Sequence, residues 1–158
     1  MKQQLDRWLG NFLAVLLAAM VLVVLWGVFT RYVLANSAGW TDELARFLLV
    51  WVAILGASYV TGRRAHLSIN LLESKLSARA QRRLQRGITL LVALFVTSVL
   101  IIGGGRLVYL THHLGQTSAA LRLPMWIVYA VLPLSGTIIL IYQALELSTP
   151  KEHQPTAL

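Results

Sequence analysis

Four long apolar runs limit what this chain can fold into more than any other feature. They cover Leu9 to Thr30, Leu44 to Thr61, Ile88 to Leu110 and Met125 to Leu145, and they contain very few charges. The first run alone would rise about 33 Å as a helix, and the hydrocarbon core of a bilayer is about 30 Å thick. The apolar residues are continuous rather than alternating, which excludes a transmembrane β-barrel. The sequence therefore predicts an all-α integral membrane protein with four transmembrane helices.

The composition fits a single membrane domain. Of the 158 residues, 57% are hydrophobic and 13% charged, which leaves too little polar surface for a soluble domain. We expect one four-helix domain over residues 1–147 and a polar C-terminal tail over residues 148–158. The expected spans are about 9–31, 42–62, 88–110 and 125–146. The first run is longer than the apolar core of a signal peptide, so we expect it to be retained as a helix.

The distribution of basic residues predicts the orientation. Ten of the 14 lysines and arginines lie before the first span, between the second and third, or after the fourth, and four lie on the other side. The positive-inside rule therefore places both termini in the cytoplasm. The net charge is +8, but the basic residues lie between apolar runs. We therefore expect anionic phospholipid, not nucleic acid, as the charged partner.

The segment between the second and third spans has an amphipathic pattern. Apolar residues recur there at spacings of three and four, while the arginines lie mostly off this stripe. The pattern predicts an amphipathic cytoplasmic loop helix, which would lie on lipid or act as an arm that holds a partner subunit. Ser77 is suited to cap a helix that starts at Ala78 and continues into the third span. The stripe consists of Ile69, Leu72, Leu76, Ala80 and Leu84.

Residues for catalysis or ion transport do not gather in this sequence. No charged residue lies at the middle of any expected span, where a transporter would need one. The histidines lie at or outside the span ends, and the adjacent His112 and His113 would point about 100° apart on a helix. We therefore expect no enzyme activity, no cofactor and no metal site. The chain reads as a partner of other membrane proteins.

Two features are expected to shape the last two spans. Residues 103–105 are three consecutive glycines, which favour close approach of another helix or a looser third span. Pro133 lacks a backbone donor and would free the carbonyl of Tyr129 one turn earlier. We therefore expect a bend in the fourth span.

The second span opens with charges of both signs. Thr41 is suited to cap the helix, and Asp42 and Glu43 would then lie in its first turn, where the helix dipole favours acids. Arg46 lies four and three residues after these acids, which are spacings that allow ion pairs. Helix chemistry accounts for the charges but not for the whole group in which they occur. That group is Trp40, Glu43, Arg46, Trp51 and Gly56.

In this combination the sequence resembles a known family. The stretch "RYVL…GWTDELARFLLVWVAILGASY", followed by "RRAHLSINLL", is similar to the first half of the small membrane subunit of tripartite ATP-independent periplasmic (TRAP) transporters, the DctQ type. The stretch "GQTSAALRLPMWIVYAVLPLSG" is similar to a second signature of that family. The resemblance runs from the first helix to about Tyr142.

The resemblance implies a function and partners. In this family a periplasmic binding protein captures an organic acid, and a large membrane subunit carries it inward with an ion gradient, usually sodium. The small subunit pairs with the large one, braces it and helps to dock the binding protein. The resemblance points to interface or docking residues, without catalytic, cofactor or metal residues. The candidates are Arg31, Trp40, Glu43, Arg46, Trp51, His66, Leu72, Leu76, Pro124, Trp126 and Tyr129.

Two alternatives remain open at the level of the sequence. One is an autonomous small transporter, which would move substrate without any partner. The other is a membrane-anchor subunit of a redox enzyme, which would carry a cofactor. We expect Glu43 and Arg46 to be held by each other or by the large subunit.

Overall fold

The computed structural model describes residues 2–35, 38–64 and 78–148, and the regular structure in these ranges is helical. Four stretches are long and apolar enough to cross a membrane: Gln4–Tyr32, Gly39–Gly62, Gly87–His113 and Met125–Leu145. They confirm the four spans predicted from the sequence. The elements in chain order are α1 (Lys2–Tyr32), α2 (Gly39–Arg64), α3 (Ala78–Phe95), the π-helix η1 (Val96–Gly103), α4 (Gly104–His113), α5 (Met125–Tyr129) and α6 (Val131–Ser148).

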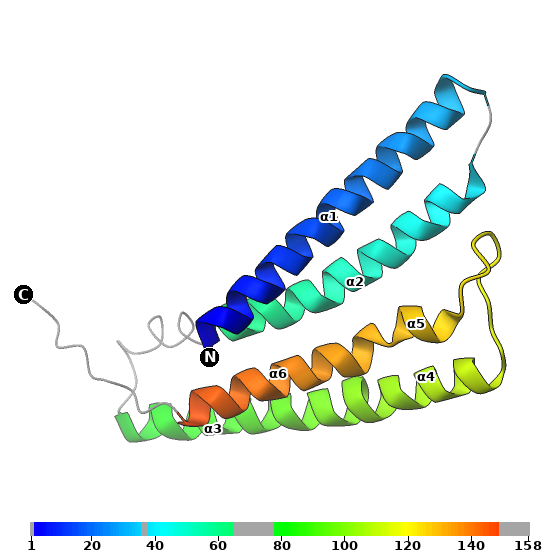
Figure 1. The fold of residues 1–158 in the computed structure, drawn as a ribbon. Helices are drawn as coiled ribbons and strands as arrows, with labels where there is room; N and C mark the ends of the chain where they lie inside the picture. Colours follow the sequence, from blue (N-terminus) through cyan, green and yellow to red (C-terminus); the bar gives the residue numbers. More distant parts are fainter. Residues whose placement is uncertain (1, 36–37, 65–77, 149–158) are drawn as a thin grey trace, which may run out of the picture.

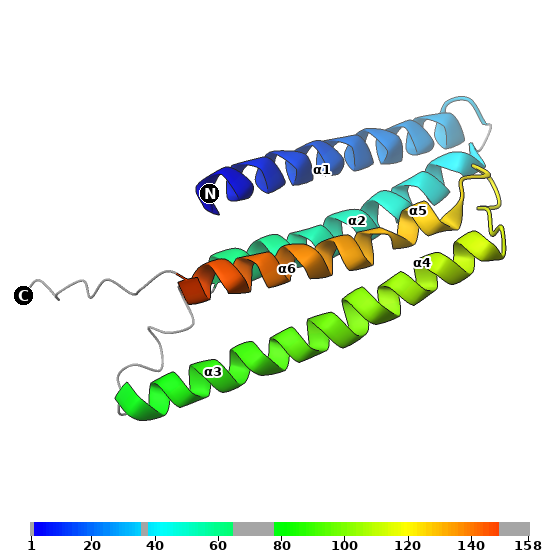
Figure 2. The ribbon, with the colours of Figure 1, turned by 60° about the horizontal axis from the view of Figure 1, so that its bottom comes forward.

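The four spans pack as a row rather than as a closed bundle (Figures 1 and 2). The first span, α1, packs mainly against α2, α2 also packs against α6, and α6 packs against the third span, which is α3, η1 and α4. The end of α1, the start of α2 and the α4–α5 connection lie at the same end of the row, which we call the loop end. The start of α1 and the end of α6 lie at the opposite end, which we call the terminal end.

The buried core lies where α1, α2 and α6 meet. Leu9, Leu55, Val131 and Tyr142 form its buried centre, and partly buried neighbours such as Trp51 pack around it. Many other large apolar side chains are exposed on the surface of the chain. This distribution suits a protein surrounded by lipid, in which helices gain little from hiding apolar surface and associate through close packing and hydrogen bonds.

Polar side chains connect α6 to the first two helices at two places described here. Within the row, the hydroxyls of Ser58 and Ser135 are buried and lie 2.7 Å apart, and Ser135 also donates to the carbonyl of Ile54 at 3.4 Å. At the terminal end, the Tyr142 hydroxyl donates to Asp6 Oδ1 at 2.5 Å. A hydroxyl in an apolar surrounding needs such a partner, so these contacts favour one alignment of the helices.

Glycines set the approach between α6 and the third span. A Cβ added to Gly104 would lie 2.7 Å from Leu132 Cβ, and one added to Gly136 would lie 2.9 Å from Ile101 Cγ1. At Gly105 an added Cβ would meet no atom within 4 Å. Close packing, one of the two readings of the glycine triplet, is therefore confirmed for Gly104.

The fourth span, in which Pro133 predicts a bend, is interrupted one turn before the proline. It consists of α5 and α6, which are separated at Ala130, three residues before Pro133. The helix that leads into the third span begins at Ala78, as expected. Its expected cap, Ser77, and the Ile69, Leu72 and Leu76 part of the amphipathic stripe lie outside the described residues.

Candidate functional site

The second span begins at the loop end with Gly39, and Thr41 already lies inside its first turn. The Thr41 hydroxyl donates to the carbonyl of Ala38 at 2.7 Å, and the Thr41 N–H donates to the same oxygen at 3.0 Å. The prediction that Thr41 caps the helix is therefore wrong, because α2 starts two residues earlier. Thr41 is instead buried against α1, where a Cβ added to Gly27 would lie 2.8 Å from Thr41 Oγ1.

The connection between α4 and α5, residues 114–124, folds back on itself. The N–H of Ser118 donates to the carbonyl of Leu123 at 2.8 Å, and the N–H of Met125 donates to the carbonyl of Gln116 at 2.9 Å. The buried Ser118 hydroxyl accepts from the N–H of Leu123 at 3.3 Å. These bonds across the base define a compact turn, which we call the α4–α5 loop, with residues 119–121 at its tip.

The carboxylate of Glu43 binds the tip of the α4–α5 loop. Glu43 Oε1 accepts from the N–H of Ala119 at 3.1 Å, and Oε2 accepts from the N–H groups of Ala120 at 2.8 Å and Leu121 at 3.0 Å. Consecutive N–H groups in a turn form a concave site that suits an anion, and hydrogen bonds to a charged acceptor are stronger than neutral ones. Glu43 therefore fastens the α4–α5 loop to the first turns of α2.

The other acid at the start of α2 pairs with α1. Arg31 Nη2 lies 2.9 Å from Asp42 Oδ2, and both side chains are about half exposed, at 51% and 58%. An exposed pair of this kind contributes about 0–1 kcal/mol. The spacing of Arg46 allowed a pair with Asp42 or Glu43, but these acids have other partners. Within residues 2–35, 38–64 and 78–148, Arg46 forms no ion pair.

Arg46 borders an open hollow between the start of α2 and the tip of the α4–α5 loop. The hollow has a volume of about 320 Å³. A charged guanidinium, a carboxylate that is already hydrogen-bonded and apolar groups meet there. The lining residues are Gly39, Glu43, Arg46, Phe47, Ala119 and Ala120.

The other candidates divide between this site and the rest of the chain. Trp40 is exposed at the loop end, and Trp51 lies deeper in α2 against the buried core. Trp126 in α5 contacts the ring of His112 edge-on, with 5.9 Å between the ring centroids. Pro124 precedes α5 and Tyr129 ends it. Candidates His66, Leu72 and Leu76 lie outside the described residues.

Sequence reasoning missed the N–H groups that donate hydrogen bonds to the Glu43 carboxylate. The acceptor was singled out, but its donors are backbone N–H groups of two alanines and a leucine, which carry no side-chain signal. The Ser58–Ser135 contact was also missed, although small polar residues within apolar spans are a known sign of helix contacts. In the part of the chain that the structure describes, no three His, Cys, Asp or Glu side chains form a group that could hold a metal ion.

The fold and the site define an integral membrane protein of four helices, with polar contacts that hold helices and a loop in register. Comparison with known proteins identifies the family. The model of the family described as "Tripartite ATP-independent periplasmic transporters, DctQ component" matches residues 20–150, so the chain belongs to this family. The family consists of transporter components, which are not enzymes.

Curated relatives give the same picture. The chain is 32% identical over 99 residues to the C4-dicarboxylate TRAP transporter small permease protein DctQ of Rhodobacter capsulatus, with 63% of this chain and 43% of the relative covered. It is 27% identical over 88 residues to the sialic acid TRAP transporter small permease protein SiaQ of Vibrio cholerae, with 56% and 51% covered. The match therefore spans about half the length of these relatives.

A third relative is much longer than this chain. The isethionate TRAP transporter permease protein DctMQ of Oleidesulfovibrio alaskensis is 27% identical over 130 residues. The match covers 78% of this chain but only 20% of the relative.

Proposed function

We propose that this protein is the small membrane subunit of a TRAP transporter that braces a large permease subunit. Together they would take up an organic acid that a periplasmic binding protein delivers. A sodium gradient would drive this uptake. The four-helix row, within residues 1–147, acts as one membrane domain in this proposal. The relatives named for C4-dicarboxylate, sialic acid and isethionate support an organic acid as the substrate class.

The open row of helices is the observation that carries the bracing role. The first span contacts mainly α2, and the third span forms the other edge of the row, so the described spans surround no path of their own. A secondary transporter needs polar or ionisable groups at mid-depth for its substrate and ion. The spans described here have no charged residue at mid-depth, so a larger partner would supply that site.

The DctMQ relative supports a large partner. Most of that relative lies outside the match, so a much longer permease chain contains a region similar to this protein. Segments that are joined in one protein and separate in another often work together. We infer that this chain associates with a separate large permease subunit.

The proposed orientation follows from the basic residues. Both termini lie in the cytoplasm, and the loop end, with the Glu43 site, faces the periplasm. The excess of lysine and arginine on the terminal side supports this orientation and contact with anionic phospholipid. Accessibility of a cysteine at position 116 to an impermeant thiol reagent in intact spheroplasts tests it. Labelling only after the membrane is opened would reverse the orientation.

Reconstitution tests the function. The protein is purified with the large permease that we expect to be encoded beside it, placed in liposomes and supplied with candidate acids and the binding protein expected from the same gene cluster. We expect uptake that requires all three proteins and an inward sodium gradient. Substrate flux through liposomes that contain this chain alone would overturn the bracing role and favour an autonomous transporter. A bound redox cofactor in the purified complex would favour the anchor role.

A further inference from the structure

We propose that the α4–α5 loop, fastened by Glu43, is a preformed docking surface for an acidic segment of a water-soluble protein partner, with Arg122 and Arg46 as its charged contacts. The inference rests on the proposed function, since it requires the loop end to face the compartment of the soluble binding protein. It adds to that function the chemistry of the contact and the residue that holds the surface in shape.

The surface is already ordered in the isolated chain. Bonds within the α4–α5 loop define its base, and three N–H groups at its tip, from Ala119 to Leu121, are bound by Glu43. A loop that must become ordered on binding reduces the affinity by the entropy that it loses. Because Glu43 has already fixed this loop, a partner would not have to order it.

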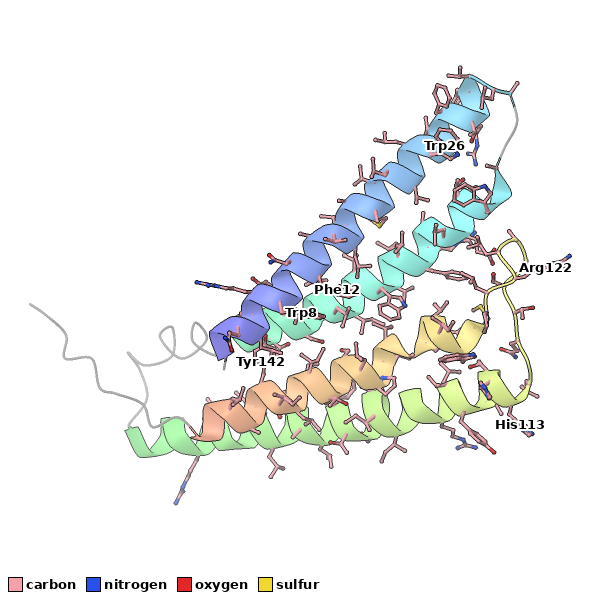
Figure 3. The ribbon with its side chains drawn as sticks, viewed as in Figure 1. Trp8, Phe12, Trp26, His113, Arg122 and Tyr142 are labelled. Carbon is pink, nitrogen blue, oxygen red and sulfur yellow. The ribbon has the colours of Figure 1, made fainter. Side chains whose placement is uncertain are left out.

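Arg122 stands at the exposed side of this loop. Its φ is 52°, a left-handed conformation that favours glycine and is uncommon for an arginine. Its side chain is exposed and projects away from the ribbon (Figure 3). An unfavourable conformation that the surrounding contacts maintain is a feature of functional sites. Here the conformation aims a long cation into the space beyond the helix ends.

Charge complementarity selects an acidic partner. The two acids at the start of α2 are engaged, Asp42 by Arg31 and Glu43 by the tip of the α4–α5 loop. In the described ranges, Arg46 and Arg122 form no ion pair. Arg46 also borders the open hollow beside the tip, together with small and apolar groups and Glu43, whose carboxylate is already bound by the tip of the loop. Carboxylates on a partner would form ion pairs with both arginines and would attract the partner as it approaches.

The first test measures how the binding protein expected from the same gene cluster binds to the complex of this chain and its large permease in nanodiscs. In Arg122→Asn the new side chain tolerates the positive φ but carries no charge. We expect severalfold weaker binding and a smaller dependence of binding on salt. Arg122→Lys, which keeps the charge, should restore most of the affinity. Arg106→Asn, the same loss of charge on exposed Arg106 of α4, is the matched control and should change binding little. Equal effects of both asparagine variants would overturn the proposal.

The second test separates the shape of the loop from its charge. Glu43→Gln makes this end of the molecule more positive, so electrostatics alone predicts tighter binding of an acidic partner. The proposal predicts weaker binding, because an amide cannot accept from all three N–H groups at the tip of the loop. Tighter binding by Glu43→Gln would overturn the role of the preformed loop.

The outcomes also separate this inference from the proposed function. If the complex assembles and transports, but Arg122→Asn binds normally, the docking surface is wrong and the bracing role stands. If the large permease does not co-purify, or the loop end faces the cytoplasm, the proposed function and the docking surface fail together.

Discussion

The loop end and the terminal end of this molecule are held together by different chemistry. At the loop end, one carboxylate, that of Glu43, binds three backbone N–H groups. At the terminal end, the Tyr142 hydroxyl donates to Asp6, and the Tyr142 ring covers Gly62, where an added Cβ would lie 2.8 Å from ring carbons. The first contact fixes a loop against a helix, and the second aligns helices with one another.

The difference follows from which backbone groups are free. Asp6 and Tyr142 lie inside helices, where each N–H is bonded to a carbonyl four residues earlier, so their contact is made by side chains. A turn leaves N–H groups unbonded, and a single acid can satisfy several of them. One residue at the loop end can therefore replace several contacts, and its loss should have correspondingly larger local effects.

Removing Glu43 should break the loop end most strongly. In Glu43→Ala, the N–H groups of Ala119, Ala120 and Leu121 lose their acceptor, so the α4–α5 loop should open more often. Hydrogen–deuterium exchange of the purified complex should show severalfold faster exchange at these amides. Asp42→Ala is the matched control, since the Asp42 carboxylate pairs with Arg31 and not with the α4–α5 loop, and it should leave the loop unchanged. Unchanged exchange in Glu43→Ala would show that bonds within the loop suffice.

Filling the space above Gly62 should break the terminal end. In Gly62→Ala, the new methyl group would clash with the buried ring of Tyr142. Inserting a carbon into a packed site costs about 1–3 kcal/mol, so thermal unfolding of the purified subunit should shift to a lower temperature. Gly56→Ala in the same helix meets no atom within 4 Å and should be neutral or slightly stabilising. Equal shifts in the two variants would contradict the close contact.

Removing only the hydroxyl of Tyr142 should have a smaller effect. Tyr142→Phe keeps the ring over Gly62 but loses the bond to Asp6, which contributes about 1.5 kcal/mol, the lower end for a bond to a charged group, because the pair is only partly buried. Its unfolding temperature should lie between those of the wild type and Gly62→Ala. Asp6→Asn, which keeps a carbonyl acceptor, should be closer to wild type. The hydroxyl would be irrelevant if Tyr142→Phe were as stable as the wild type.

Removing the serine contact that lies midway between the two ends should have the smallest effect. Ser135→Ala removes the bonds to Ser58 and to the Ile54 carbonyl, and hydrogen bonds between membrane helices average about 0.6 kcal/mol. We expect a small shift in unfolding temperature and normal exchange at the α4–α5 loop. Faster loop exchange in this variant would show that the loop end depends on the helix contacts and is not held locally.

The sequence predicts where each helix begins and ends better than it predicts the contacts between helices. Hydropathy located all four spans, and Pro133 indicated that the fourth is not a straight helix, because both signals depend on residues close in sequence. The order of the helices in the row has no such signal. It depends on which helix faces meet, and at Gly104 and Gly136 the decisive feature is the absence of a side chain.

The sequence indicated the charged side chains of the candidate site but not their partners. Glu43 and Arg46 stand out as charges in an apolar helix, but nearby spacing suggested that they pair with each other. The actual partner of Glu43 lies 76 to 78 residues later, and it consists of backbone groups that any non-proline residue has. Local spacing cannot reveal a contact of this kind, because it depends on the fold of the whole chain.

The π-helix η1 contains one residue more than a regular α-helix would need for the same number of turns. The buried residues along η1 and α4 are Val96, Gly104 and Thr111. Val96 and Gly104 are eight residues apart across η1, whereas Gly104 and Thr111 are seven residues apart within α4. An ordinary α-helix completes two turns in about seven residues. A shorter homologue that lacked one residue within η1 could therefore form a regular α-helix and still present the glycine to α6. An alignment of this family should accordingly permit a gap at this point, and aligning the span without one would match Gly104 with the wrong residue.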